Sequence, residues 1–137
     1  EFALDYIQEI SLGIDFTARD LQSELKAKGH PWELAKGFDG SAVIGDFIAP
    51  NRLPSLSNIE FYLEQNGERV QHGLSQDMLF SLTDIICFVS QYFKLQMGDL
   101  IYTGTPAGVG PVAIGDELRG LLVTRDGPVE LLGCSVR

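Results

Sequence analysis

The densest group of polar side chains in this sequence lies within residues 15–22. Its members are Asp15, Thr17, Arg19, Asp20 and Gln22. Polar groups at a strand-to-helix junction are readily presented to a ligand, because the connecting backbone lies at the surface. Arg19 could offer an anion a planar fork of donors, and Gln22 an amide. A structural interpretation is also open: Asp15 or Thr17 could cap the following helix, while Arg19 and Asp20 are solvated.

A second candidate is the glycine-rich stretch GTPAGVG at residues 104–110. Its glycines would let the backbone approach a ligand closely, and Thr105 adds a hydroxyl group. Taken alone the stretch is a weak signal, because a β-turn between two strands has the same composition.

Several common catalytic motifs are absent from the sequence. It has no GxSxG nucleophile turn, HExxH zinc motif, GxxxxGK[ST] phosphate loop, or GxGxxG stretch that opens a helix after a strand. Neither His30 nor His72 has sequence neighbours that indicate a base or a metal ligand, so we expect ordinary surface or turn residues. Cys87 and Cys134 lack the spacing of a redox or zinc motif and are expected to be reduced thiols.

Composition indicates the class of protein and limits its partners. The chain has 137 residues, 45% hydrophobic and 21% charged, which fits one soluble globular domain. Its net charge of -9 argues against nucleic acid and anionic membrane as partners, because both need clustered Lys and Arg. An anionic substrate would therefore have to meet locally placed cations. The longest apolar run is too short to span a bilayer and there is no signal-peptide pattern, so we expect a cytoplasmic protein.

The candidate residues of the first group must be positioned by a strand and a helix. Residues 9–16 alternate apolar and polar side chains, which predicts a strand with Asp15 at its end. Good helix formers follow over residues 19–28 and are closed by Gly29, which predicts a short helix. Residues 32–38 are compact enough to form one helical turn.

The rest of the chain is predicted to be sheet with one more helix. Asn66 and Gly67 separate two alternating runs and predict a β-hairpin. Thr83 or Asp84 could cap a helix whose apolar stripe is expected in the core. The stripe consists of Ile85, Ile86, Val89, Tyr92 and Phe93. Glycines over residues 98–127 punctuate short apolar runs, as in β structure with tight turns. The whole pattern predicts a single β-rich α+β domain.

Four stretches of the sequence together resemble the fumarylacetoacetate hydrolase family. They are DFTARDLQ at residues 15–22, KGHPWELAKGFD at 28–39, NGERVQHG at 66–73 and GDLIYTGTPAGVG at 98–110. The second stretch is most similar to acylpyruvate and fumarylpyruvate hydrolases. The resemblance extends over nearly the whole chain. It implies that residues 1–137 form the family's catalytic core domain, incomplete at its N-terminus.

The resemblance implies a mixed β-sandwich roll, a homodimer, and Mg²⁺ or Mn²⁺ held between carboxylates. Asp15 matches the family's metal-binding aspartate, and Lys36 matches its active-site lysine. Arg19 and Gln22 stand at the family's substrate-contact positions and would lie one helical turn further on than Asp15, near the same ligand. Thr105 matches the threonine that binds the substrate carboxylate.

The activity that the resemblance implies is hydrolysis of a C–C bond in small anionic acylpyruvate-type β-dicarbonyl acids through a metal-bound enolate, as in aromatic catabolism. A hard cation with oxygen ligands can polarise a 1,3-dicarbonyl, and Lys36 would add positive charge for the developing oxyanion. Oxaloacetate decarboxylation and isomerisation of an unsaturated dicarboxylate would use the same residues, so both stay open. A non-catalytic binding domain with this fold is a further alternative.

The sequence opens at Glu1 without an initiator Met, and we expect a longer polypeptide. The resemblance implies that the other metal ligands, a Glu-x-Glu pair, precede residue 1. The water-activating His and Glu of the family would also lie there, because no residue of this sequence matches them.

Overall fold

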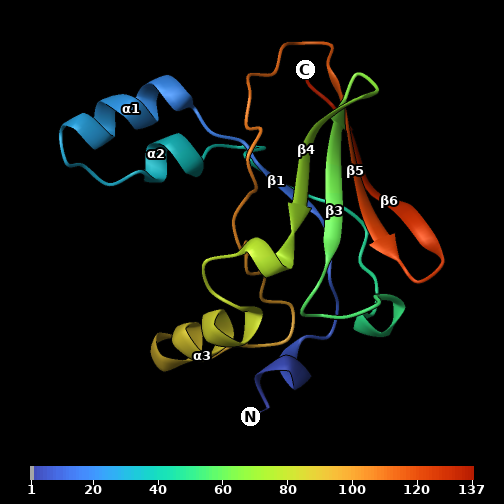
Figure 1. Ribbon diagram of the computed structural model, residues 1–137. Coiled ribbons are helices and arrows are strands. Elements are labelled where there is room, and N and C mark those ends of the chain that lie inside the picture. The colour runs from blue at the N-terminus through green and yellow to red at the C-terminus, as the bar shows by residue number, and fades with distance from the viewer. Residues whose placement is uncertain (1) are drawn as a thin grey trace.

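The computed structural model describes residues 2–137, which form two antiparallel sheets and three α-helices (Figure 1). The larger sheet has the strand order β4-β3-β5-β6, and the smaller one pairs β1 with β2. The strands are β1 (Gly13–Asp15), β2 (Ala42–Ile44), β3 (Glu60–Gln65), β4 (Glu68–Leu74), β5 (Glu117–Thr124) and β6 (Gly127–Ser135). The helices are α1 (Arg19–Ala27), α2 (Glu33–Lys36) and α3 (Leu82–Tyr92), with 3₁₀ turns at Ala3–Tyr6, Pro50–Arg52 and Ser75–Asp77. The predicted α+β class is confirmed.

The hydrophobic core lies against one face of the larger sheet. Side chains alternate along β5, so that Leu118 and Leu122 are buried while Glu117 and Arg119 are exposed. The core cluster consists of Ile48, Leu53, Ile59, Leu122 and Leu131. Because two members of this cluster, Ile48 and Leu53, come from the segment after β2, the core also holds that segment against the sheet.

The small sheet is attached to the large one through backbone contact. The Asp46 amide donates to the Leu131 carbonyl at 2.6 Å. Gly45 lies so close that an added Cβ would be only 2.2 Å from the same carbonyl oxygen, a distance that no side chain tolerates. Glycine at position 45 therefore allows the β1–β2 pair to sit directly on β6.

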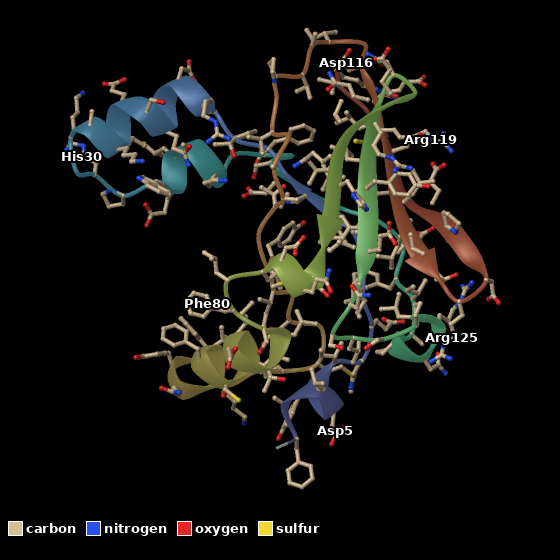
Figure 2. The ribbon with its side chains drawn as sticks, viewed as in Figure 1. Asp5, His30, Phe80, Asp116, Arg119 and Arg125 are labelled. Atoms are coloured by element: carbon tan, nitrogen blue, oxygen red, sulfur yellow. The ribbon has the colours of Figure 1, made fainter. Side chains whose placement is uncertain are left out.

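The predicted hairpin forms between β3 and β4. Asn66 and Gly67 both have positive φ, 54° and 83°, as a type I′ turn requires. The turn is fastened to Asp116, which precedes β5: Asn66 Nδ2 donates to Asp116 Oδ1 at 2.8 Å, and Gln65 Nε2 donates to Asp116 Oδ2 at 2.7 Å. Figure 2 shows Asp116 at this end of the sheet.

Helix α1 and the turn α2 confirm the prediction, whereas two predicted β regions are shorter than expected. The helix ends at Ala27, and Gly29 follows with a φ of 65°. The strand expected over residues 9–16 is restricted to β1, with only an isolated bridge between Ile10 and Ile48 before it. Residues 94–116 form no strand, and side chains of β3 and β4 bond the backbone carbonyls of Pro106, Ala107 and Pro111.

The prediction for α3 was wrong in two respects. Its N-cap is Ser81 and not Thr83 or Asp84: the Ser81 hydroxyl accepts from the Asp84 amide at 3.1 Å, while the Asp84 carboxylate accepts from the Ser81 amide at 3.0 Å. The stripe expected in the core includes no fully buried residue, and Tyr92 is 67% exposed. The first residue of the helix, Leu82, packs against the core cluster, and the helix also contacts the 3₁₀ turn Ala3–Tyr6, whereas Phe88 and Tyr92 are exposed. None of the described helices is long and apolar enough to cross a membrane.

The Asp116 contacts predict a pH dependence of stability. Hydrogen bonds from Asn66, from the Ala113 amide and from Gln65 lower the pKa of Asp116 below its ordinary value of 3.8. Because the pKa of Asp116 is lower in the folded state than in the unfolded state, its ionised form stabilises the fold. This contribution is complete at pH values above the unfolded-state pKa, and it is lost as the pH falls through the folded-state pKa. We expect Asp116→Asn to lower Tm at pH 7. One carboxylate oxygen is replaced by an NH₂ group, which cannot accept the hydrogen bonds that Gln65, Asn66 or the Ala113 amide donate.

The difference in Tm between the wild type and this variant should shrink as the pH is lowered below 3.8. A Tm difference that stays constant from pH 7 to pH 2 would contradict the role assigned to the carboxylate.

Candidate functional site

A lysine, a carboxylate and a hydroxyl meet where β1 ends. Lys36 Nζ donates to Asp15 Oδ2 at 2.6 Å and to Thr17 Oγ1 at 2.8 Å. The side chains of Lys36 and Asp15 are 34% and 50% exposed, so both can be reached from solvent. The structure therefore brings together two of the predicted site residues that lie 21 positions apart in the sequence.

Backbone hydrogen bonds fix the positions of these three residues. Asp15 is paired with Ala42 of β2, and the next amide, that of Phe16, donates to the Ser41 carbonyl at 2.7 Å. The Ala18 amide donates to the Ala35 carbonyl at 3.1 Å, and the Ala35 side chain is fully buried. As a result α2 is attached to the chain that leaves β1, and Lys36 points back at Asp15.

The structural interpretation in which Asp15 or Thr17 caps α1 was wrong. The N-cap is Ala18, with no capping side chain. The Thr17 hydroxyl instead donates to the Asp15 carbonyl at 3.2 Å, while its oxygen accepts from Lys36. The carboxylate of Asp15 therefore takes no part in capping and accepts a hydrogen bond from Lys36.

Arg19 and Gln22 form a second pair on the first turn of α1. Arg19 Nη1 donates to Gln22 Oε1 at 2.6 Å, which is the contact expected for residues three apart on a helix. Arg19 is exposed and Gln22 half-buried. This leaves most of the Arg19 donors and the Gln22 amide group open to a ligand. No hydrogen bond joins this pair to Asp15, Lys36 or Thr105 in the part of the chain that the structure describes.

Thr105 lies in the extended segment before β5 and is held from β4. Gln71 Nε2 donates to Thr105 Oγ1 at 3.0 Å, and Thr105 itself is exposed. The alternative for the stretch 104–110, a β-turn between two strands, was wrong, because no strand flanks it on the N-terminal side within residues 94–103.

Tyr102 connects the segment that carries Thr105 to the small sheet. Its hydroxyl donates to the Val43 carbonyl of β2 at 3.0 Å. Its ring covers Gly13 so closely that an added Cβ would lie 2.6 Å from the ring. Burial raises the pKa of Tyr102 above its ordinary value of 10.0, and the nearby charge of Asp15 raises it further. The phenol therefore remains a donor at neutral pH. Thr105 follows three residues later, so its Cα atom lies within about 11 Å of that of Tyr102.

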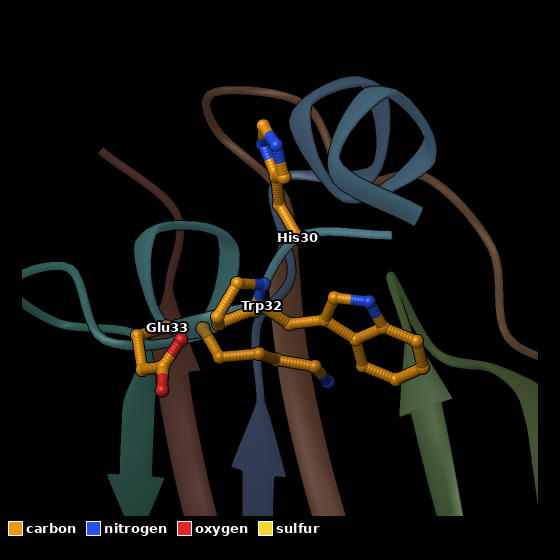
Figure 3. Close-up of a pocket in the computed structure, with 5 residues that line it drawn as sticks. His30, Trp32 and Glu33 are labelled. Carbon is orange, nitrogen blue, oxygen red and sulfur yellow. The ribbon is translucent and has the colours of Figure 1, made fainter. Parts of the chain in front are cut away.

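An open hollow of about 470 Å³ adjoins Lys36 (Figure 3). The other residues that line it are His30, Pro31, Trp32 and Glu33. Trp32 is 45% exposed, so its indole presents an apolar surface next to the lysine. His72 lies elsewhere, on β4, with Nε2 2.9 Å from Glu60 Oε1. Within residues 2–137 neither histidine lies in a group of three potential metal ligands.

A larger cleft of about 760 Å³ lies between the N-terminal segment, α3 and residues 95–104. Its lining is mostly apolar, and it reaches Gly13 and Tyr102 without including Asp15, Lys36 or Arg19. We place the candidate site at the Lys36 cluster, because charged groups able to act on a polar substrate are gathered there.

The described residues fit only part of a divalent-metal site. Asp15 offers carboxylate oxygens, the donor type that Mg²⁺ and Mn²⁺ prefer. Within residues 2–137, however, no three His, Cys, Asp or Glu side chains come together around one point. Since these ions need several oxygen ligands, the described residues could supply one ligand and do not form a complete site by themselves.

The sequence predictions omitted three residues that shape this region: Thr17, Gln71 and Tyr102. Thr17 had been considered only as a polar residue or a helix cap. Gln71 and Tyr102 lie inside two of the stretches that carry the family resemblance, so the signal was present. Their contacts join positions at least 34 residues apart and could not be inferred from spacing.

Comparison with known proteins gives a family match and close relatives. Residues 1–131 match the family described as fumarylacetoacetate (FAA) hydrolase C-terminal. The protein named oxaloacetate tautomerase FAHD1, mitochondrial, from Bos taurus is 44% identical over 117 residues, which are 85% of this chain and 53% of that protein. The Homo sapiens protein of the same name matches to the same extent. The chain thus spans about half the length of these curated relatives.

Solved structures show the same fold. Fumarylpyruvate hydrolase from Pseudomonas aeruginosa, in complex with Mn²⁺ and pyruvate, has a TM-score of 0.87 at 33% identity and matches 98% of this chain and 56% of that chain. A 5-carboxymethyl-2-hydroxymuconate delta-isomerase from Mycobacterium smegmatis has a TM-score of 0.79 at 30% identity and matches 94% of this chain and 49% of that chain. The fold therefore occurs in both a hydrolase and an isomerase.

We predict that Asp15→Asn separates metal binding from stability. The variant removes an ion pair between partly exposed groups, worth about 1 kcal/mol or less, and no helix cap is lost. Calorimetric titration of the natural polypeptide with Mn²⁺ should show a large loss of affinity, because a neutral amide replaces a charged ligand.

The matched control is Asp20→Asn on α1, whose carboxylate accepts from the neighbouring Leu21 amide. It should leave the affinity for Mn²⁺ unchanged. Equal affinities in the wild type and Asp15→Asn would exclude Asp15 as a ligand.

Proposed function

The chain belongs to the fumarylacetoacetate hydrolase family, and we propose that it acts in a divalent-metal-dependent hydrolase that cleaves a C–C bond in small acylpyruvate-type β-dicarbonyl acids. Such a reaction adds water to the acyl carbonyl and breaks the bond to the neighbouring carbon. The electron pair of that bond passes to the pyruvate part as an enolate. The protein must then bind a small anion and stabilise negative charge on oxygen.

The observation that carries this proposal is the contact of Lys36 with both Asp15 and Thr17. One ammonium group, held at 2.6 and 2.8 Å from two oxygens, has a third hydrogen left for an oxygen of the substrate. A fixed positive charge stabilises charge that develops during the reaction without the cost of reorienting water. We assign Lys36 the catalytic role of stabilising the oxyanion.

Arg19, Gln22 and Thr105 are the residues we assign to the carboxylate of the substrate. The net charge of -9 repels an anion at long range, so binding depends on local donors. Arg19 supplies a planar guanidinium that Gln22 already orients at 2.6 Å. Thr105 supplies a hydroxyl on a segment held in place by β2 and β4.

We propose Mg²⁺ or Mn²⁺ as the cofactor, with Asp15 as one ligand and the other ligands and the general base outside these 137 residues. The support is the oxygen donor type of Asp15 and the Mn²⁺ complex of the similar fumarylpyruvate hydrolase. When bound, the ion would act as a Lewis acid toward the dicarbonyl. A homodimer and a cytoplasmic location remain predictions, although the related tautomerases are named as mitochondrial.

A second candidate is tautomerisation of oxaloacetate. Relatives at 44% identity bear that name. Oxaloacetate is also a small β-dicarbonyl acid, and its keto and enol forms differ by a proton shift through an enolate. The groups assigned above to the oxyanion and the carboxylate would serve this reaction equally. Decarboxylation and isomerisation remain open for the same reason, so substrate assays decide between them.

We predict that the natural polypeptide hydrolyses acetylpyruvate or fumarylpyruvate with Mg²⁺, and that the 137-residue chain alone does not. Absorbance of the enol would follow both hydrolysis and oxaloacetate tautomerisation, while product analysis distinguishes them. Conversion of oxaloacetate between its keto and enol forms, without cleavage of an acylpyruvate, would favour the tautomerase. Turnover by the 137-residue chain would refute the placement of the base outside it, and no turnover by either protein would support a binding domain.

We predict different kinetic effects from Arg19→Met and Lys36→Met. Arg19 would bind the carboxylate equally in the ground and transition states, so its loss should raise KM and lower kcat/KM roughly tenfold to a hundredfold. Lys36 would act on charge that grows during the reaction, so its loss should mainly lower kcat.

Lys28→Met provides a control. The substitution also removes one positive charge, but Lys28 pairs with Glu24 of α1 and not with Asp15. A methyl ester of the substrate should reduce the effect of Arg19→Met alone. If acid and ester lose activity by the same factor in both variants, the assigned roles are wrong.

A further inference from the structure

Gln71 of β4 is the main side-chain anchor of residues 105–107. Its Nε2 lies 3.0 Å from Thr105 Oγ1, 3.0 Å from the Pro106 carbonyl and 3.4 Å from the Ala107 carbonyl. The next residue, Gly108, is packed on the same strand, since an added Cβ there would be 2.2 Å from the Val70 carbonyl oxygen. The amide thus faces three oxygens of one short loop.

These oxygens determine which way the Gln71 amide is turned. Carbonyl oxygens only accept hydrogen bonds, so the group that faces Pro106 and Ala107 must be the NH₂ and not the amide oxygen. The same nitrogen has no acceptor capacity toward Thr105. The hydrogen bond between the two side chains therefore runs from Gln71 to Thr105 Oγ1, and the two hydrogens of the NH₂ group are shared among the three oxygens.

The direction of this hydrogen bond leaves the hydroxyl hydrogen of Thr105 available for another partner. A hydroxyl that accepts one hydrogen bond can still donate one, and donation by Thr105 is not used by any partner within residues 2–137. Thr105 is exposed, whereas Gln71 is half-buried behind it. The free donor is consequently on the side that a ligand can reach.

We propose that Gln71 is a positioning residue that orients the Thr105 hydroxyl as a hydrogen-bond donor to a carboxylate of the substrate. This inference rests on the proposed function, in which Thr105 meets the carboxylate. Gln71 acts through Thr105 and does not touch the substrate. It also favours an anionic ligand, because one lone pair of the Thr105 hydroxyl is already used by Gln71 while its hydrogen is free to be donated.

The same segment contains a matched comparison. Gln65 of β3 donates from Nε2 to the Pro111 carbonyl at 3.3 Å and to Asp116 Oδ2 at 2.7 Å. It is thus a second glutamine that anchors this connection to the sheet, but it contacts no hydroxyl of the candidate site. A purely structural anchor should behave like Gln65.

The test compares Gln71→Met, Gln71→Glu and Gln65→Met in the natural polypeptide, with circular dichroism and thermal unfolding as checks of folding. Gln71→Met should raise KM for the acid substrate about tenfold with a smaller change in kcat, since it removes the donor that orients Thr105. Gln71→Glu should be worse, because its carboxylate would take the Thr105 hydrogen and repel the substrate. Gln65→Met should lower Tm without a comparable change in KM.

A double-mutant cycle with Thr105→Val tests whether Gln71 acts through Thr105. In the Thr105→Val background, Gln71→Met should add little to KM, because the hydroxyl that it orients is absent. Additive effects, or equal losses for the acid and its methyl ester, would overturn the proposal. So would an unchanged KM in a folded Gln71→Met variant.

Binding of pyruvate in the presence of Mn²⁺, measured by calorimetry, separates this inference from the proposed function. Weaker pyruvate binding by the Gln71 variants in a protein that turns over no dicarbonyl substrate would support the positioning role and refute the proposed reaction. Normal turnover of the dicarbonyl substrate, together with a pyruvate affinity that is independent of Gln71, would support the proposed reaction and refute the positioning role.

Discussion

The close backbone contact between Gly45 and Leu131 is the constraint on which the candidate site depends. It allows the β1–β2 pair to lie directly on β6, with the Asp46 amide hydrogen-bonded to the Leu131 carbonyl. Asp15 stands at the end of that pair, and the chain that follows it is tied to Ser41 and Ala35. The carboxylate and Lys36 are therefore attached to a rigid sheet, although both are partly exposed.

The connection from residue 94 to residue 116 is held by a different kind of interaction. It forms no strand and is anchored by side chains. Tyr102 of the connection donates to β2, while Gln71 of β4 and Gln65 of β3 donate to the connection. Each anchor is a hydrogen bond between a side chain and the backbone or another side chain. This arrangement leaves the exposed edges of the loop free, so that Thr105 can face a ligand while its backbone is fixed.

Three groups able to act on an anionic substrate are thus presented from separate elements. Lys36 with Asp15 lies at the end of β1, Arg19 with Gln22 on α1, and Thr105 on the connection before β5. The chain also spans about half the length of its curated relatives, and residues 2–137 gather no complete set of metal ligands. Both facts are consistent with a catalytic centre to which these residues contribute one part.

The sequence by itself determined the family, the α+β class, the helix α1, the turn α2 and the Asn66–Gly67 hairpin, because each follows from residues that are neighbours in the chain. It also indicated Asp15, Lys36 and Thr105 as candidates through family motifs. Only the tertiary structure decided that Lys36 contacts Asp15, that Gln71 donates to Thr105, and that the stripe on α3 is not a buried core. These features depend on packing between segments far apart in sequence, where spacing and hydrophobic period carry no information about which partner a side chain meets.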